Sequence, residues 1–441
     1  MPLYREMGPV ASTFLVIGNI VGIGIFTTSG LIAGRLGASP WLIGIWILGG
    51  LLALVGALCY SKLGVLYPHA GGEYAFLRPT FGPMAAFLSG WSSLFIGFTA
   101  PIAASALGFA HYLVSFLPAG AADDGLTLRG IAALSLLLVS VLFSFGLKAG
   151  NRLHSLITVA NLALVLLFAI LVLYVVPWEK HLAPALSGRI GAADFPSLGS
   201  SVILVMFTYS GWNAAAYVAG EIRNPARNIP LAMITGTILV VVLYCLMNLA
   251  YLAGSSLPSI SNEVAVAEVT ASTVFGEFGR NVVNTLILFS ILSSLTAMAI
   301  AGPRVYYAMA DDGLFPHWLT RVDARRKIPL RAIWFQTLVA LCFVAVGSLY
   351  QILVYSGFVL ILFSTLTIAG LFKVSRSRFL PAAFIAVNIV VLGSAAVSDP
   401  GETLAGLGTV ALGLPVYAYY RRKQRAEEGS SELEAGSWKR E

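Results

Sequence analysis

Charged residues are scarce in this sequence. Only 11% of its 441 residues are Asp, Glu, Lys or Arg, whereas 58% are hydrophobic, and an average soluble chain is roughly a quarter charged. Because a soluble fold needs a charged surface, the composition excludes a soluble protein and predicts a polytopic membrane protein. The net charge of +7 does not indicate nucleic-acid binding, since the basic residues lie between apolar segments rather than on one folded face.

Cysteine and histidine are also rare. The three cysteines, Cys59, Cys245 and Cys342, lie inside apolar segments, where we interpret them as small buried side chains rather than a disulfide framework or a metal site. His111 and His154 lie toward the ends of apolar segments and are weak candidates for proton binding. We therefore predict no metal, no cofactor and no catalytic residue, which disfavours a membrane-embedded enzyme.

Long apolar runs dominate what is present. A membrane-spanning helix needs about 20 apolar residues, and twelve candidate spans leave no room for a sizeable soluble domain. We expect an all-α protein with a single transmembrane domain over residues 1–420, followed by a disordered cytoplasmic tail at 421–441. The predicted spans lie near 8–33, 41–61, 83–116, 130–146, 153–176, 198–219, 230–253, 281–310, 332–348, 351–372, 379–397 and 403–420.

Positive charge sets the predicted orientation. With the N-terminus in the cytoplasm and twelve spans, most basic residues fall on the cytoplasmic side, as the positive-inside rule requires. This asymmetry predicts a multi-pass protein of the plasma membrane with both termini cytoplasmic. Of the 27 basic residues, those expected outside are Arg35, Arg129, Lys180, Arg189 and Arg280.

Two predicted spans contain glycine-rich interruptions. The first carries GIGIF at 22–26 and the sixth carries FTYSGWN at 207–213. Glycine has a low helix propensity, and unwound backbone is tolerated in a bilayer only where protein or a cavity receives it. The spacing divides ten spans into two inverted groups of five, repeat one at 8–176 and repeat two at 198–372, with 379–420 outside. Broken helices at matching positions of inverted repeats are typical of a transporter binding site.

The chemistry of such breaks fits an α-amino acid. The half-helix that starts after Gly24 presents N–H groups and a positive dipole end, which suit a carboxylate. Carbonyls near Ile20, Val21 and Phe207 suit an ammonium group, and Phe207 is a plausible cover for the pocket. No charged residue is expected near the middle of the membrane, which favours a neutral substrate side chain. The alternative is that both segments are kinked packing helices.

Four motifs in order resemble one family of carriers. They are residues 22–26, 67–83 with YPHAGGEY at 67–74, 207–225, and 302–316 with GPRVYYAMA at 302–310. Over nearly the whole chain the sequence is similar to the amino acid–polyamine–organocation superfamily, and within it to bacterial relatives of the L-type amino acid transporters. This resemblance implies a LeuT-type fold, in which two inverted five-helix repeats with broken helices 1 and 6 are joined by two additional helices.

The resemblance also implies substrate contacts. The amides of Ile23 and Gly24 would hold the carboxylate. The carbonyls of Ile20 and Phe207 would hold the amine, with Ser210 nearby, while Phe207 acts as a gate on the extracellular side and Asn213 lines the site. The implied substrate-binding residues are Ile20, Val21, Gly22, Ile23, Gly24, Phe207, Ser210 and Asn213.

Two positions depart from the family pattern. Ile23 stands where many relatives have serine, so backbone amides alone must hold the carboxylate. Asn161 stands where many relatives have a lysine, so lysine-dependent coupling is not carried over. The hydroxyls of Ser290, Ser293 and Ser294 offer oxygens to a possible coupling site for sodium, although serines in membrane helices commonly bond between helices. No cysteine occurs in the loop 117–129, so no disulfide-linked accessory subunit is expected.

Taken together, the sequence predicts a secondary active transporter of neutral L-amino acids that works by alternating access, as an exchanger or a proton-linked carrier. Its expected partners are the amino acid and membrane lipid. An amine or polyamine carrier is the alternative, and an acidic residue lining the pocket would favour it. A non-transporting amino acid receptor is a further alternative, which a long ordered cytoplasmic domain would favour.

Overall fold

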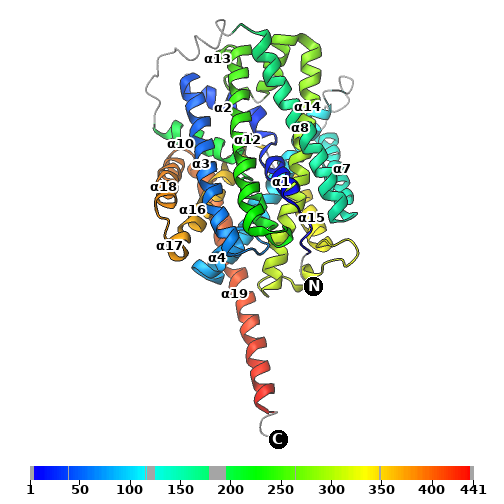
Figure 1. The fold of residues 1–441 in the computed structure, drawn as a ribbon, viewed down its shortest axis with the longest axis vertical. Coiled ribbons are helices and arrows are strands. Elements are labelled where there is room, and N and C mark those ends of the chain that lie inside the picture. Colours follow the sequence, from blue (N-terminus) through cyan, green and yellow to red (C-terminus); the bar gives the residue numbers. More distant parts are fainter. Residues whose placement is uncertain are drawn as a thin grey trace.

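The structure is a bundle of helices. Both ends of the chain lie at the same end of the molecule (Figure 1). In this computed structural model the placed part of the chain is almost entirely helical. The predicted external residues Lys180 and Arg189, and most of the loop 117–129, lie outside the described residues. The described residues are 4–37, 39–114, 116, 125–177, 195–263, 265–346 and 349–437.

The first half of the chain contains the first helix break and a helix that the sequence did not reveal. Pro9 starts α1 at the position where a missing N–H is not needed, and Gly82 with Pro83 separates α4 from α5. The helices are α1 (Pro9–Ile20), α2 (Gly24–Leu36), α3 (Ser39–Leu66), α4 (Glu73–Phe81), α5 (Pro83–Ser92), the π-helical η1 (Ser93–Thr99), α6 (Ala100–Val114), α7 (Gly125–Ser144) and α8 (Leu147–Val175).

The second half contains the second break and the longest helices. Helix α14 changes direction at Gly276, whose φ of 67° interrupts the helical backbone. The elements are α10 (Phe195–Thr208), α11 (Ala214–Tyr217), η2 (Ala219–Glu221), α12 (Pro225–Gly254), α13 (Leu257–Ile260), α14 (Val266–Asp311), η3 (His317–Thr320), α15 (Leu330–Val346), α16 (Leu349–Ala369), α17 (Leu371–Val374), α18 (Phe379–Ser398) and α19 (Pro400–Ser437).

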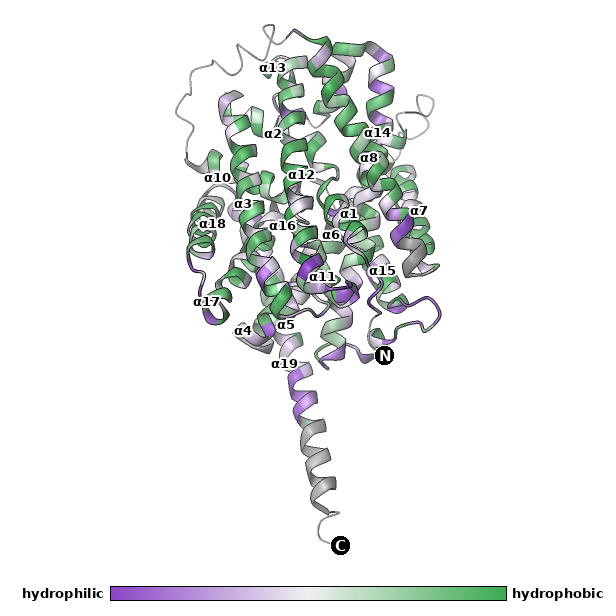
Figure 2. Ribbon diagram, in the orientation of Figure 1, coloured by the Kyte–Doolittle hydropathy of each residue, from purple (hydrophilic) through white to green (hydrophobic). Residues whose placement is uncertain are grey.

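Apolar spans make up most of the bundle. Within the described residues, 9 helices are long and apolar enough to cross a membrane, and two shorter apolar helices cover Ser197–Thr208 and Leu330–Ala345. Figure 2 shows hydrophobic residues along these helices and hydrophilic ones gathered near α4, α11 and the N-terminus, and where α19 leaves the bundle. The prediction of a polytopic all-α membrane protein is therefore confirmed.

The centre of the bundle is formed around the two broken helices. Helix α12 packs against α3 and α1, while α14 packs against α8 and α1. Outward-facing side chains such as Leu134, Leu156 and Tyr174 are largely exposed, as expected for a surface that faces lipid. The breaks are thus enclosed by neighbouring helices, the only setting in which unwound backbone is tolerated within a bilayer.

One expectation from the sequence is wrong. The tail was expected to be disordered from residue 421, but α19 continues as a helix to Ser437. The stretch between the predicted spans 41–61 and 83–116 contains a further helix, α4, which packs against α5. Two glycines with positive φ, Gly71 (118°) and Gly72 (57°), turn the chain immediately before α4 and direct Glu73 back into the protein.

Candidate functional site

Both predicted helix breaks are present. Helix α1 ends at Ile20, Val21 is extended with φ −77° and ψ 93°, and α2 begins at Gly24. Helix α10 ends at Thr208 and α11 begins at Ala214, with Gly211 between them at φ 105°. The alternative of two kinked but continuous helices is therefore wrong, since three to five residues leave the helical path at each break.

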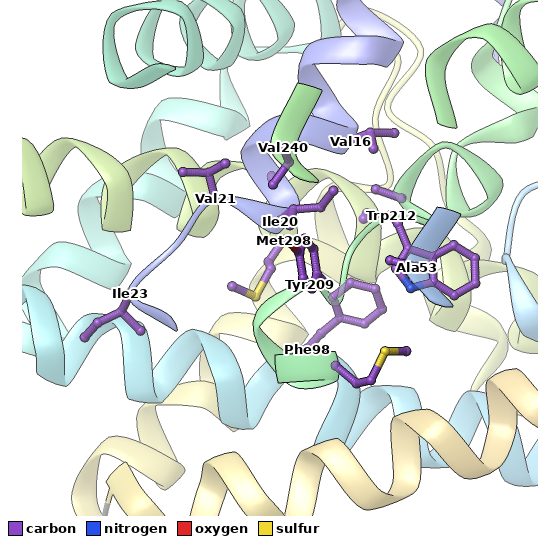
Figure 3. Packing of buried hydrophobic residues seen from close by; sticks show 14 of the residues in the cluster. Val16, Ile20, Val21, Ile23, Ala53, Phe98, Tyr209, Trp212, Val240 and Met298 are labelled. Atoms are coloured by element: carbon purple, nitrogen blue, oxygen red, sulfur yellow. The ribbon is translucent and has the colours of Figure 1, made fainter. Parts of the chain in front are cut away.

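The two breaks lie against each other. A Cβ atom placed on Gly211 would come 2.8 Å from the backbone carbonyl of Asn19, and one on Gly24 would come 2.8 Å from the side chain of Thr208. The hydroxyls of Thr28 and Thr208 are 2.9 Å apart. Figure 3 shows Ile20, Val21 and Ile23 spread along the first break, with Tyr209 and Trp212 on the second. Segments almost 200 residues apart in sequence therefore form one site.

A cavity of about 90 Å³ opens between the breaks. Water needs roughly 10–15 Å³ measured in the same way, so the cavity has room for a small polar group such as an amino acid head group. The π-helical η1 and helices α6 and α16 supply part of its apolar wall through Phe98, Pro101 and Leu360, respectively. The predicted site residues that line it are Ile20, Gly22, Ile23, Gly24, Phe207, Ser210 and Asn213.

One predicted residue is placed differently. Val21 is fully buried in the apolar core and is not among the residues that line the described cavity. Figure 3 shows its side chain leaving the break away from Tyr209. Any part that Val21 plays in binding would therefore come from its backbone.

The first break offers backbone groups of both polarities. The amides at the start of α2 have no acceptor within the helix, and the N-terminal dipole end favours a negative group there. The carbonyl of Ile20 accepts a hydrogen bond from the Tyr244 hydroxyl at 2.9 Å, and the carbonyl of Phe207 accepts one from the Ser210 N–H at 2.9 Å. Because a carbonyl oxygen has two lone pairs, each keeps one acceptor position.

An acidic side chain also lines the cavity, which corrects the expectation of an uncharged pocket. Glu73, the first residue of α4, is 3% exposed and is the one charged residue in the described lining of the cavity. Its carboxylate accepts hydrogen bonds from the Tyr60 hydroxyl at 2.7 Å and from Asn213 Nδ2 at 3.3 Å. Burial raises the pKa of the Glu73 carboxyl to about 7, and these hydrogen bonds, with one from Ser89, oppose the rise.

The polar residues of the second break form a network with Glu73. Asn213 Nδ2 donates to Glu73 and also to the hydroxyl of Tyr217 at 3.2 Å. Phe207, the predicted gate, is half-buried and lines the cavity. Its Cβ would lie 3.4 Å from a Cβ on Gly357, which places Phe207 between the cavity and α16.

The predicted coupling residues gather between α8 and α14. Ser290 donates a hydrogen bond to the side-chain oxygen of Asn161, and the hydroxyl of Ser293 lies 2.8 Å from that of Thr158. Ser294 lies elsewhere, next to Gly22 in the cavity wall. No group of three or more His, Cys, Asp and Glu side chains suited to a metal occurs in the part of the chain that the structure describes.

His154 belongs to the same helix interface. The sequence placed it at the inner start of a span, but the structure buries it against α1 and α14. Its Nδ1 lies 2.8 Å from the Thr296 hydroxyl and its Nε2 lies 3.1 Å from the carbonyl of Phe14. The ring also fills the space beside Gly18, where a Cβ would come 2.4 Å from it.

A buried ion pair anchors the chain beyond the second break. Arg304 of α14 donates from Nε and Nη2 to the two carboxylate oxygens of Glu221, at 2.7 and 3.1 Å. Its Nη1 donates to the carbonyl of Ile300 at 2.6 Å. Both side chains are almost completely buried, so the pair fixes η2 against α14 with two-point geometry.

Sequence reasoning missed several contributors to the site, among them Glu73, Thr208 and Tyr244. Glu73 had a usable signal, because two consecutive glycines precede an acidic residue and allow a sharp turn. Thr208 and Tyr244 had none, because hydroxyl-bearing residues are frequent in this chain and only the packing of α12 against α1 shows which carbonyl Tyr244 reaches.

Comparisons with known proteins agree with this architecture. A family model described as amino acid permease matches residues 7–398. The chain belongs to the amino acid permease family. The match confirms the resemblance to the amino acid–polyamine–organocation superfamily and makes the protein a membrane transporter of amino acids rather than an enzyme.

Individual relatives cover most of the chain. The serine/threonine exchanger SteT of Bacillus subtilis (strain 168) is 29% identical over 440 residues, which cover 96% of this chain and 98% of that protein. The b(0,+)-type amino acid transporter 1 of Homo sapiens is 29% identical over 382 residues, 85% of this chain and 77% of that protein. The large neutral amino acids transporter small subunit 2 of Mus musculus is 26% identical over 442 residues, 96% of this chain and 83% of that protein.

Proposed function

We propose that this permease is a secondary active carrier of neutral L-amino acids that works by alternating access, as an exchanger or a proton-linked carrier. The observation that carries the proposal is the meeting of two helix breaks around one cavity, which is lined by the start of α2 and by Ile20 and Phe207. The amides of Ile23 and Gly24 would hold the carboxylate, and the two carbonyls with Ser210 would hold the amine.

We further propose a LeuT-type arrangement of twelve spans in one domain, 1–420. Three observations support it. The breaks fall in the first and sixth predicted spans, and the two ends of the chain lie at the same end of the bundle (Figure 1). The shorter apolar helices of α10 and α15 add to the 9 long ones, and α19 contains the twelfth predicted span, 403–420. The repeats would cover 8–176 and 198–372, with both termini in the cytoplasm of a cell whose plasma membrane holds the protein.

The gate and the coupling site remain part of the same proposal. Phe207 would close the cavity on the extracellular side, as its place between the cavity and α16 allows. Asn161, Ser290 and Ser293 would form the coupling region, with Ser294 connecting it to the first break. We expect no disulfide-linked accessory subunit, since the free cysteines Cys59, Cys245 and Cys342 all lie in helices.

One observation favours the second candidate, an amine or polyamine carrier. Glu73 is an acidic residue in the cavity wall, and it would pair with a substrate that has a positive charge but no carboxylate. The amides at the start of α2 would then have no partner. The names of the amino acid-carrying relatives and the paired breaks support the first candidate more strongly.

Uptake into proteoliposomes separates these candidates and the modes of coupling. Purified protein would be tested with imposed pH and sodium gradients, with and without internal amino acid, using a neutral amino acid and its decarboxylated amine as substrates. We expect uptake of the amino acid, stimulated by internal amino acid for an exchanger or by an inward proton gradient for a proton-linked carrier. Uptake of the amine without uptake of the amino acid would contradict the proposal.

A further inference from the structure

Glu73 joins the cavity to three surrounding elements. Its carboxylate receives the hydroxyl of Tyr60 from α3, the amide of Asn213 from the second break and the hydroxyl of Ser89 from α5, the last at 3.5 Å. Oε1 accepts the hydrogen bonds from Tyr60 and Asn213, whereas Oε2 accepts the longer one from Ser89. Glu73 also lines a small second cavity of about 10 Å³ behind the first, together with Ser92 and Ser93.

Among the described residues, no positive charge pairs with this carboxylate. The described lining of the cavity contains no Lys, Arg or His, and none of the ion pairs among the described residues includes Glu73. The titratable groups that face it are the phenols of Tyr60 on α3 and Tyr217 on α11. The buried cation on α14, Arg304, is paired with Glu221 instead.

A buried carboxylate without a cation has two ways to lower its energy. It can bind a proton, or it can be paired with a positive charge that enters the cavity. The zwitterionic head group supplies no net charge, because its amine and carboxylate balance each other. The charge that decides between the two states is therefore that of the substrate's side chain.

We propose that Glu73 selects substrates by the charge of their side chain: its protonated form accepts amino acids with neutral side chains, and its ionised form accepts amino acids with cationic side chains. This inference rests on the proposed function and extends it to a second class of substrate. A cationic side chain beside protonated Glu73 would lie in a buried cavity without a counter-charge, which is strongly unfavourable.

The direction of the pH dependence follows from burial. Because burial raises the pKa of Glu73 to about 7, the carboxyl is mostly protonated at low pH and mostly ionised at high pH. The uptake of cationic substrates relative to neutral ones should therefore increase as the pH rises. The side chain of lysine, with a pKa near 10.4, stays charged throughout this range, so a change in its uptake must come from the protein.

The test is counterflow of leucine and lysine in proteoliposomes at pH 6, 7 and 8, with the same pH on both sides of the membrane. The readout is the ratio of lysine to leucine uptake, which a common loss of activity does not change. For the wild-type protein we expect this ratio to rise about a hundredfold from pH 6 to pH 8, following the ratio of ionised to protonated carboxyl for a group with a pKa near 7.

Three variants locate the effect. Glu73→Gln has no carboxyl to ionise at this position. Its ratio of lysine to leucine uptake should therefore be the same at every pH, at the low value that the wild type shows at pH 6. Glu73→Asp keeps a titratable carboxyl and should keep a pH-dependent ratio. Glu277→Gln removes an exposed carboxylate on α14 and should behave as the wild type. Ligand-induced thermal shifts of the wild-type protein with leucine and lysine at pH 6 and 8 give the same comparison without any substitution.

The outcomes separate this inference from the proposed function. If the wild type takes up leucine but its ratio is the same at each pH, or if Glu73→Gln keeps the pH-dependent ratio, the inference is wrong and the proposed function stands. If Glu73→Gln is folded and loses leucine and lysine uptake in the same proportion at each pH, its ratio still changes with pH as that of the wild type does, and the inference is wrong. If the wild type takes up neither amino acid, the proposed function itself is wrong.

Discussion

The two helix breaks contribute to the same cavity but are built in different ways. The first break, residues 21–23, has no polar side chain of its own and is held by close packing and by the Tyr244 hydroxyl on the Ile20 carbonyl. The second break, residues 209–213, carries Ser210 and Asn213 and connects to Glu73 through a side-chain network. Under the proposed function, the first break would present backbone to the head group, which is the same in all substrates, while the second would add side chains that distinguish one substrate from another.

The largest expected effect is on stability and concerns the buried ion pair of Glu221 and Arg304 beyond the second break. Glu221→Gln leaves the guanidinium of Arg304 buried without its carboxylate, which costs about 3–5 kcal/mol in comparable buried pairs. We expect a large drop in the melting temperature of the purified protein in detergent. The first break has no comparable ion pair within the described residues, so its stability should not depend on a single charge.

A matched control for that variant is Glu277→Gln. Glu277 pairs with Arg280 at 3.3 Å on an exposed part of α14, where its side chain is 81% exposed, and surface pairs contribute little. An equal loss of stability in both variants would show that Glu221 acts through net charge rather than through its pair with Arg304.

The next effect compares the glycines of the two breaks. Gly211 has φ 105°, and a Cβ there would also press on the backbone of Asn19, so Gly211→Ala should cost about 1–3 kcal/mol in strain and weaken substrate binding about tenfold or more. Gly22→Ala should be milder, because the nearest atom is the side-chain oxygen of Ser294 at 2.9 Å. Binding measured by thermal shift would rank the two variants.

A second substitution sharpens this ranking. Adding Ser294→Ala to Gly22→Ala removes the nearest obstructing atom and should restore part of the binding. No second side-chain change can relieve Gly211→Ala, since the obstruction there includes the backbone of Asn19. The distinction between the two positions would be wrong if Ser294→Ala restored no binding to Gly22→Ala. It would also be wrong if Gly211→Ala had a milder effect on binding than Gly22→Ala.

The smallest expected effect concerns the support of the first break. Tyr244→Phe removes the hydrogen bond to the Ile20 carbonyl, and a single hydrogen bond of this kind contributes about 0.5–1.5 kcal/mol. We expect substrate affinity to fall by a factor of roughly two to ten. Ring contacts of Tyr244 with Trp46 and Tyr209 remain in this variant, so an unchanged affinity would mean that the hydroxyl does not position the carbonyl.

Local sequence signals predicted much of this architecture because the bilayer makes them strong. Long apolar runs give the spans, glycines beside β-branched residues give the break at 22–24, and Gly211 gives the second break. These features depend on a few neighbouring residues, which is why reading along the chain was sufficient for them.

The missed features depend on tertiary contacts. The buried position of Glu73 requires the turn at 71–72 and the packing of α4 against α5. The pairing of Glu221 with Arg304 joins residues 83 positions apart. The helical continuation of α19 to Ser437 was missed because its charged residues were interpreted as a disordered tail, although Lys, Arg, Glu and Gln are also good helix formers.

The central claim is that the head group of an amino acid is held between the two breaks. The most direct test is calorimetric binding of leucine to the purified protein, compared with binding of the amine that lacks its carboxylate and of the acid that lacks its amine. The account predicts that leucine binds and that each analogue binds at least about tenfold more weakly, a difference of about 1.4 kcal/mol or more. Equal affinity for leucine and for the amine without the carboxylate would contradict the claim.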